Sequence, residues 1–473
     1  MNNLEFCGMS VVDMANAVKT RKISPVELVS NILALIEKLN PKVNAYCTLA
    51  AENARKKAIE AENAVLRQDK LGPLHGVPVS IKDLIDTEGI RTTYGSKVYE
   101  NFIPTQSAIV VQRLEAAGAI VVGKTNTPEF GWTGTTYNKI FGKTRNPWDL
   151  NRTSGGSSGG AAAAVAACIS PLAIGSDGGG SIRIPSSFCG VFGFKPSFGY
   201  IPRYPELPGW ETLDHLGPIT RTVEDAAIAM EIISGWDNRD HYAIPVKGLR
   251  FLPLKRNDLK GLTVAWSKDL GQAIVEPEVL NITGAAVKVF ANLGAKIEDA
   301  SPKVKNPESA YSTYVGVRMA TVFKDRIEAG DDLLDPYFAR FIKLNINKKA
   351  IEYAAADFEM NLYRHSILTF FNKYDLLLTP VIGIPAFSID MYAPKEIAGV
   401  KVSPMGWAAF TYPFNITGQP AASVPCGWTD SGLPVGIQIV GRRFDDVKVL
   451  NAAAAFEQAA PWNNRLPPLL NGV

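Results

Sequence analysis

Two serines in glycine-rich segments are the residues of this chain best suited to chemistry. One segment covers residues 154–160 and contains Ser157, and the other covers residues 175–181 and ends at Ser181. Glycine adopts backbone conformations that other residues avoid, and it lets a substrate carbonyl approach main-chain N–H groups closely. A serine beside such a turn is a candidate nucleophile. The candidate donors to an oxyanion are the N–H groups of Gly178, Gly179 and Gly180.

A serine hydroxyl is a weak nucleophile at neutral pH and needs a base. Lys82 follows a Val/Ile-rich segment, residues 77–81, which predicts a short buried strand. Burial removes solvent from an ammonium group and lowers the pKa of a lysine, so that its amine can accept a proton. Taken alone, Lys82 predicts only a strand-end lysine in an ordinary ion pair. Together with the two serine segments it becomes a candidate base.

Other interpretations of the first serine segment stay open from the residues alone. It is also typical of a flexible Gly/Ser linker, although the alanine-rich run at 161–167 predicts a helix directly after it. A phosphate-binding loop would continue with Gly-Lys-Ser/Thr, and this one continues with alanine. The spacing around Ser158 fits a nucleophile elbow, whose histidine partner would be His215, His241 or His365. Polar residues precede it, however, where an elbow requires a buried strand.

These segments together resemble the amidase signature family, whose members cleave amides with a Ser–cis-Ser–Lys triad. The separations of 75 residues from Lys82 to Ser157 and 24 residues from Ser157 to Ser181 fit this resemblance. Similar motifs extend over nearly the whole chain, from residues 24–28 to residues 432–438. The resemblance is therefore specific rather than confined to one short pattern.

The resemblance implies a role for each member of the triad. Ser181 attacks the carbonyl and becomes acylated, Ser157 follows a cis peptide bond and passes the proton, and Lys82 is the base. Arg183 resembles a family arginine with a structural role. The family commonly has threonine or isoleucine where this chain has Gly178. We therefore expect the oxyanion N–H to be kept in a wider or looser site.

Aromatic residues follow residues 128–129 and are candidates for contact with the substrate. Large aromatic side chains would suit an apolar or aryl group, and they are equally typical of core packing. The candidates are Phe130, Gly131, Trp132 and Tyr137.

The framework predicted for these residues is an α/β fold. Strands alternating with helices indicate a mostly parallel sheet that is covered by helices on both faces. The resemblance implies the fold of the amidase signature family, in which this sheet is large, twisted and mixed. Ser24 begins a capping box, residues 108–118 predict a helix, and residues 120–122 predict a strand. Residues 235–260 are polar and contain prolines, which we interpret as a surface excursion. We therefore expect a single amidase domain over residues 1–473.

Composition limits the class of partner. The 49 basic and 46 acidic residues give a formal net charge of +3, which does not favour nucleic acid or an anionic membrane. The five cysteines lack C-x-x-C spacing, which argues against a zinc site and a dense disulfide framework. They are Cys7, Cys47, Cys168, Cys189 and Cys426. We expect no metal, no cofactor and a cytoplasmic protein, and a homodimer stays open.

The sequence predicts a hydrolase of carboxylic amides that acts on a small-molecule substrate, with esters or carbamates of aryl or apolar compounds as further substrates. The alternative is the glutaminase subunit of a tRNA-dependent amidotransferase. A glutaminase needs charged groups for the α-amino and α-carboxylate groups of glutamine, and the sequence does not identify them. A binding protein without catalytic function is disfavoured, because Lys82, Ser157 and Ser181 are all present.

Overall fold

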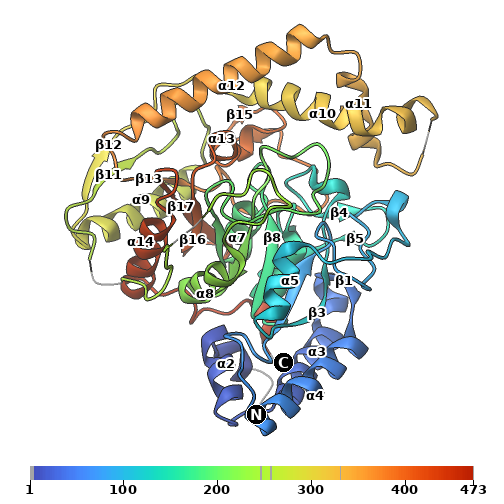
Figure 1. Cartoon of the computed structure of the whole chain (residues 1–473). Coiled ribbons are helices and arrows are strands. Elements are labelled where there is room, and N and C mark those ends of the chain that lie inside the picture. The colour runs from blue at the N-terminus through green and yellow to red at the C-terminus, as the bar shows by residue number, and fades with distance from the viewer. Residues whose placement is uncertain (1–4, 246–247, 256–257, 331, 472–473) are drawn as a thin grey trace.

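The centre of the protein is an eleven-stranded sheet (Figure 1). The computed structural model describes residues 5–245, 248–255, 258–330 and 332–471. In spatial order the strands are β1 (Tyr46–Leu49), β3 (Ile120–Thr125), β2 (Pro78–Lys82), β8 (Leu172–Ser176), β10 (Leu216–Thr220), β9 (Phe192–Lys195), β16 (Ala421–Trp428), β17 (Pro434–Gly441), β13 (Leu376–Pro380), β11 (Thr263–Trp266) and β12 (Lys296–Asp299).

Parallel pairing occurs in two blocks of this sheet. One block is β3-β2-β8 and the other is β13-β11-β12, whereas the other six neighbouring pairs are antiparallel. The α/β class and the mixed sheet agree with the sequence prediction. Antiparallel pairing at the centre is more extensive than the alternation of strands and helices indicates. One reason is that residues 429–433 join β16 to β17 by a short loop, which permits only an antiparallel hairpin.

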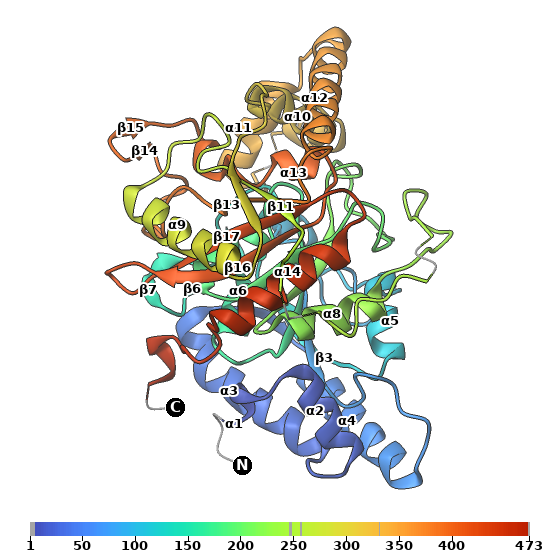
Figure 2. The same ribbon diagram turned by 90° about the vertical axis from the view of Figure 1, so that its left-hand side faces the viewer.

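Helices cover both faces of the sheet (Figures 1 and 2). In β8, Leu172 and Ile174 join an apolar cluster with α5 (Ile109–Ala116), α8 (Val223–Ile233) and α14 (Asp446–Ala459). Ala173 points the other way, since successive strand residues alternate. It joins a second cluster with α3 (Pro25–Val43) and α6 (Gly159–Ala166). The other described helices are α1 (Glu5–Gly8), α2 (Val11–Lys19), α4 (Ala51–Arg67), α7 (Arg183–Cys189), α9 (Pro277–Asn292), α10 (Glu308–Glu328), α11 (Pro336–Asn345), α12 (Ala350–Phe370) and α13 (Pro413–Ile416).

The elements predicted around the candidate residues are present, with shifts at their ends. The strand predicted over 77–81 is β2, and the helices predicted over 108–118 and 161–167 are α5 and α6. Ser24 caps α3 as predicted, because its hydroxyl accepts hydrogen bonds from the N–H groups of Val26 and Glu27. Figures 1 and 2 also place α10, α11 and α12 together at one end of the molecule.

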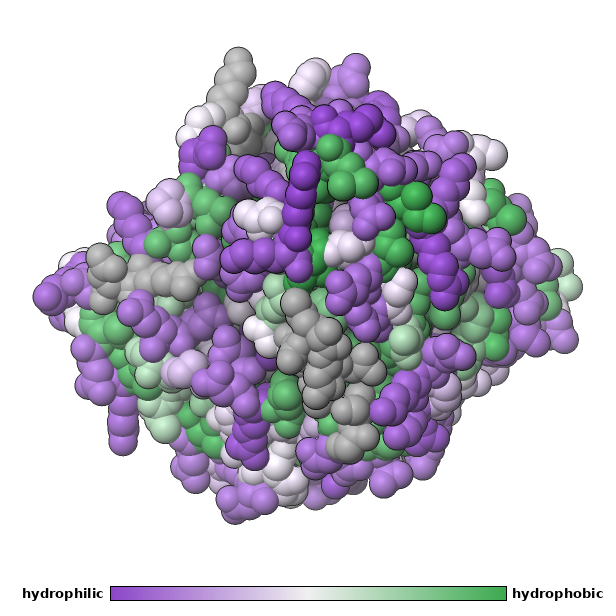
Figure 3. All heavy atoms as spheres, turned by 90° about the horizontal axis from the view of Figure 1, so that it is seen from below, coloured by the Kyte–Doolittle hydropathy of each residue, from purple (hydrophilic) through white to green (hydrophobic). Residues whose placement is uncertain are grey.

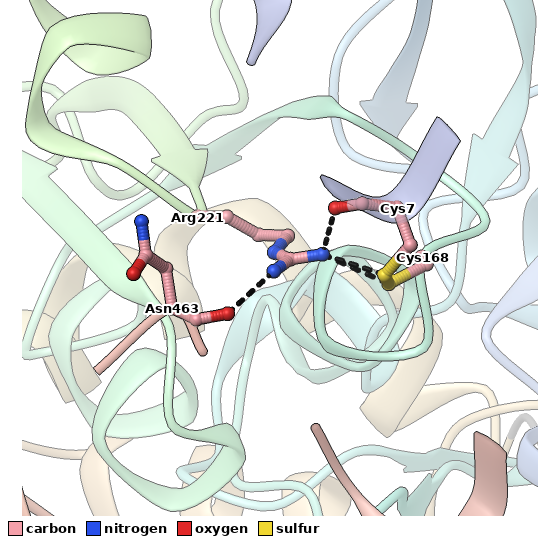
Figure 4. Close-up of a disulfide and its surroundings, with 4 residues drawn as sticks. All are labelled: Cys7, Cys168, Arg221 and Asn463. Atoms are coloured by element: carbon pink, nitrogen blue, oxygen red, sulfur yellow. Dashed lines mark hydrogen bonds between the residues drawn. A yellow bond between two sulfur atoms is a disulfide. The ribbon is translucent and has the colours of Figure 1, made fainter. Parts of the chain in front are cut away.

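A disulfide joins Cys7 of α1 to Cys168, which follows α6. Figure 4 shows the guanidinium of Arg221 beside it, where Nη1 donates to both sulfur atoms and to the carbonyl oxygen of Cys7. The sequence did not predict this pairing, since the cysteines are 161 residues apart and only the fold brings them together. Cys47, Cys189 and Cys426 are free.

The face that contains the N-terminal helices is largely hydrophilic. Figure 3 shows hydrophobic side chains on this face scattered among polar ones. In the described part of the chain, no helix has both the length and the apolar character needed to cross a membrane.

Candidate active site

Strand β2 places Lys82 at the end of its buried run, where the side chain has no solvent-exposed surface. The Nζ atom donates hydrogen bonds to Ser157 Oγ at 2.6 Å and to Ser176 Oγ at 3.0 Å. Ser176 ends β8, the parallel neighbour of β2, and parallel strands end at the same edge of a sheet. Ser176 was not identified from the sequence. The signal was its position beside Asp177, in the same glycine-rich segment as Ser181.

Ser157 lies in a buried loop directly before α6, and the predicted cis peptide bond between Gly156 and Ser157 is present. The hydroxyl of Thr136 holds this loop, because it donates to the carbonyl oxygen of Gly155 and accepts from the N–H of Gly159. The segment is thus neither a flexible linker nor exposed. Its shape follows from many short contacts that only glycine allows.

The turn that ends at Ser181 is fixed to the Ser157 loop and to Asp177. The N–H of Ser158 donates to the carbonyl oxygen of Ser181 at 3.1 Å. The carboxylate of Asp177 accepts from the N–H of Gly180 at 2.7 Å and from the N–H of Ile182 at 3.1 Å. This contact corrects the expectation for Gly180, whose only N–H is already used and is not offered to an oxyanion.

The other two glycines of this turn present their N–H groups differently. Within the described residues, no intramolecular hydrogen bond uses the N–H of Gly178 or Gly179. Gly178 also lines the cavity described below, and Ser181 keeps 8% of its surface exposed. Gly178 and Gly179 therefore stay candidate oxyanion donors.

Arg183 holds Asp177 in place. The two side chains are fully buried and form an ion pair at 2.8 Å. Arg183 also donates to the carbonyl oxygen of Thr411 and to the side chains of Gln438 and Asn415. Although burial raises the pKa of Asp177, the Arg183 guanidinium holds that pKa well below its usual range. These contacts agree with the structural role expected of Arg183.

Burial lowers the pKa of the Lys82 amine to about 7, although the negative charges of Asp214 and Asp177 oppose this shift. Burial also raises the pKa of Asp214 above its ordinary value. A lysine with this pKa is partly neutral at neutral pH, as a general base must be. The arrangement lets Lys82 accept a proton through Ser157.

A small cavity that is partly open to solvent lies next to these groups. Its polar wall contains Ser157, Ser176, Gly178 and Asp214. Its apolar wall contains Leu84, Ile85, Phe130, Leu207, Trp210 and Leu216. A cavity lined by both apolar side chains and a few polar groups is typical of a binding site for small molecules.

Among the described residues, one arginine lines this cavity, and its charge is already paired. Arg203 Nη2 lies 3.2 Å from Glu206 Oε2, and Arg203 Nη1 lies 3.9 Å from Asp214 Oδ2. All three residues line the cavity. The guanidinium is thus compensated by two carboxylates before any substrate enters.

The structure separates the aromatic candidates into two groups. Phe130 and Gly131 line the cavity, whereas Trp132 does not. Trp132 packs instead against Phe338, Phe341 and Tyr392. This corrects the expectation that Trp132 contacts substrate, because helix α11 fills the space beside its ring. Tyr137 lies in β4 (Tyr137–Asn138) with 41% of its surface exposed, and it is also outside the cavity.

The sequence predicts that the lack of a side chain at Gly178 widens the site, and the structure does not show this widening. A Cβ atom built on Gly178 would lie 2.8 Å from Cε3 of Trp210, so the indole ring already fills that space. The hydroxyl of Tyr311 donates to the carbonyl oxygen of Gly178 at 2.9 Å and holds the turn from α10. Neither Trp210 nor Tyr311 was identified from the sequence, and no local pattern marks either residue.

The nucleophile elbow is not supported. Ser158 has no exposed surface, and its hydroxyl donates to the carbonyl oxygen of Ser176 at 3.1 Å. The Nδ1 atom of His215 contacts the carbonyl oxygens of Leu213 and Asp177 rather than a serine. In the described ranges, no group of three or more His, Cys, Asp or Glu side chains is arranged to hold a metal ion.

Comparison with known proteins identifies the family. The amidase family model matches residues 27–450. An acylamidase from Rhodococcus erythropolis is 38% identical over 97% of both chains, and a component of the glutamyl-tRNA(Gln) amidotransferase from Geobacillus kaustophilus is 37% identical over 97% of this chain and 99% of its own. The crystal structure of a bacterial aryl acylamidase superposes with a TM-score of 0.91 at 32% identity, over 96% of this chain and 97% of the other. The protein belongs to the amidase signature family, whose enzymes hydrolyse amide C–N bonds.

Proposed function

We propose that this protein is an amidase that forms an acyl-enzyme on Ser181, with Ser157 as the proton relay and Lys82 as the base. The observation that carries the proposal is the contact between Lys82 and Ser157. A buried amine with a pKa of about 7 lies 2.6 Å from a serine whose loop is bonded to the backbone of Ser181.

In the first half of the reaction, Ser181 Oγ attacks the amide carbonyl carbon. Its proton passes to Ser157 Oγ as the proton of Ser157 passes to the neutral amine of Lys82. The N–H groups of Gly178 and Gly179 stabilise the oxyanion. The C–N bond then breaks, the leaving amine takes a proton back through Ser157, and Ser181 is left as an ester.

In the second half, a water molecule attacks that ester with the same relay as its base, and the carboxylic acid leaves. Ser176 supports both halves, because its hydroxyl accepts from Lys82 and keeps the amine directed at the relay. Esters and carbamates would form the same kind of acyl-enzyme, so we include them as further substrates.

The apolar wall of the cavity supports an apolar or aryl amide as the substrate. Phe130 and Trp210 face the same cavity as Ser157. The relatives named an acylamidase and an aryl acylamidase share this fold over nearly their whole length.

The second candidate function is the glutaminase of a tRNA-dependent amidotransferase, which rests on the 37% identity to a component of such an enzyme. A glutaminase would need a cation for the α-carboxylate of glutamine. Arg203 is the arginine in the cavity wall, and Glu206 and Asp214 already pair with it. This pairing favours the free amidase.

The test is hydrolysis of a panel by the purified protein: acyl anilides, primary amides, carbamates and glutamine. Activity on anilides or apolar amides, lost in Ser181→Ala, supports the proposal. Activity on glutamine alone would favour the second candidate. Absence of hydrolysis of every amide in the panel would overturn the proposal.

We also propose that the chain forms a single domain. Support comes from the eleven-stranded sheet, which takes its strands from residues between 46 and 441. A cytoplasmic location and the state of assembly stay predictions. Cell fractionation and sedimentation velocity would test them.

A further inference from the structure

The ring of Trp210 fills the space that a side chain on Gly178 would need, beside the candidate oxyanion turn. We call this space the shared volume of Gly178 and Trp210. A Cβ atom on Gly178 would lie 2.8 Å from Cε3 and 3.0 Å from Cζ3 of the Trp210 ring. Non-bonded carbon atoms are attracted best near 3.5–4.0 Å, so even one methyl group would push the ring away. The ring therefore lies where the first atom of a side chain at position 178 would be.

The Trp210 ring is held in place from several sides. Its Nε1 donates to the carbonyl oxygen of Phe130 at 3.3 Å, and its own carbonyl oxygen accepts from the N–H groups of Leu213 and Asp214. The next residue, Glu211, forms an ion pair with Arg318 of α10. These contacts make Trp210 a fixed wall of the cavity.

The position of this wall relates it to the reacting carbonyl. Trp210 lines the cavity together with Ser157 and Gly178, and the N–H of Gly178 is a proposed oxyanion donor. A ring packed against Gly178 must therefore lie beside a group attached to the scissile carbonyl. The flat face of an indole favours another aromatic ring beyond the gain from area burial alone.

We propose that Gly178 and Trp210 form a complementary pair that selects amides carrying a flat aromatic ring attached directly to the scissile amide group, on its acyl side or its amine side. This inference rests on the proposed amidase function and names its substrate class. A side chain at position 178 and a tryptophan at position 210 exclude one another, so the two positions set the specificity together.

The first test compares aromatic substrates with their saturated counterparts. Acetanilide is paired with N-cyclohexylacetamide, and benzamide with cyclohexanecarboxamide, so that the ring lies on the amine side or on the acyl side. The ratio of kcat/KM within each pair, compared between variants, removes the intrinsic reactivity of the substrates. We expect Trp210→Ala to lower at least one ratio about threefold to tenfold, the size of an aromatic pair contact.

Two matched controls accompany this test. Trp210→Phe keeps an aromatic wall and should keep both ratios within about twofold of wild type. Trp236→Ala removes a tryptophan that is 57% exposed and outside the cavity, and it should leave both ratios unchanged. If neither ratio falls threefold in Trp210→Ala, the aromatic selection is overturned.

The second test is a double-mutant cycle on the shared volume. Gly178 does not have a positive φ, so its backbone accepts alanine, and only the ring opposes the methyl group. We expect Gly178→Ala alone to lower kcat/KM by about tenfold, as overpacking does. In the Trp210→Ala background the same change should cost at least threefold less, because contacting residues couple. If Gly178→Ala lowers kcat/KM by the same factor in the wild-type and Trp210→Ala backgrounds, the proposal that the two positions share one volume is overturned.

The failure of this inference differs from the failure of the proposed function. Wild-type protein that hydrolyses both ring classes, with ratios insensitive to Trp210, overturns the inference alone. Wild-type protein that hydrolyses no amide overturns the function and the inference with it. An unchanged circular dichroism spectrum and an unchanged midpoint of urea denaturation show that Trp210→Ala is folded.

Discussion

The Nζ atom of Lys82 lies 3.0 Å from the hydroxyl oxygen of Ser176, so the amine has a second hydrogen-bond partner besides Ser157 of the proposed relay. The Ser176 hydroxyl oxygen accepts a hydrogen bond from the ammonium group and therefore favours the charged form of Lys82, whereas burial favours the neutral form. The balance of the two sets the pH at which Lys82 can act as a base.

The pH dependence of the reaction should follow from Lys82. Burial lowers its pKa to about 7, and only the neutral amine accepts a proton. We therefore expect kcat/KM to rise with pH, to reach half its maximum near pH 7, and to stay level above it. The buried network titrates together, so this midpoint belongs to the Lys82 site as a whole.

Variants of Lys82 should separate base catalysis from positive charge. Lys82→Ala should lose most activity, and Lys82→Arg should not restore it, because a guanidinium stays protonated and cannot accept the proton. Initial rates of amide hydrolysis on protein with an unchanged circular dichroism spectrum measure this. Turnover close to wild type in Lys82→Arg would contradict the proposed base.

Ser176→Ala should lower kcat by about tenfold to a hundredfold, the range expected for loss of a hydrogen bond to a charged group, and should change KM little. Loss of an acceptor for the ammonium should also move the rising limb of the pH profile to lower pH. Ser176→Thr keeps the hydroxyl and is the matched control. If the rising limb of the pH profile of Ser176→Ala stays at the wild-type pH, the proposed effect of Ser176 on the pKa of Lys82 is contradicted.

A serine-directed sulfonyl fluoride should label the peptide that contains Ser181. The label should be absent in Ser181→Ala and present in Ser158→Ala, because the Ser158 hydroxyl is bonded to the backbone of Ser176 and has no exposed surface. Peptide mass mapping locates the label. Modification of Ser158 in wild-type protein would favour the nucleophile elbow instead.

Arg183→Ala should destabilise the whole protein as well as its site. Breaking a buried ion pair from one side leaves an uncompensated charge and costs about 3–5 kcal/mol of the free energy of unfolding. Chemical denaturation with urea measures the change. Arg67→Ala removes an exposed pair with Asp69 and is the control, for which a far smaller change is expected. Equal losses in both variants would contradict the structural role of Arg183.

The sequence predicted the parts of the site whose conformation is set locally. Lys82 ends a short Val/Ile-rich run, and Ser157 and Ser181 lie in glycine segments around an alanine-rich helix, so the three local patterns together mark these residues as candidates. The cis bond at Ser157 followed from the family resemblance and is present. These features depend on neighbours within a few residues.

What the sequence did not predict depends on distant segments. Trp210 reaches the cavity because the loop between β9 and β10 brings it against Gly178, whereas Trp132 packs against Phe338 and Phe341 of α11 outside the cavity. Gly180 is withdrawn from the oxyanion donors by the carboxylate of Asp177. Each outcome is decided by which side chain occupies a shared space, and a local pattern does not carry that information.

Helix α10 contacts the walls of the site without contributing to the triad. Tyr311 holds the carbonyl oxygen of Gly178, and Arg318 holds Glu211 beside Trp210. Substitutions along this one helix can therefore change which compounds are accepted while the catalytic residues stay the same. Over evolutionary time, and in a laboratory selection for new substrates, α10 is therefore a segment where substitutions can change substrate preference without replacing a residue of the triad.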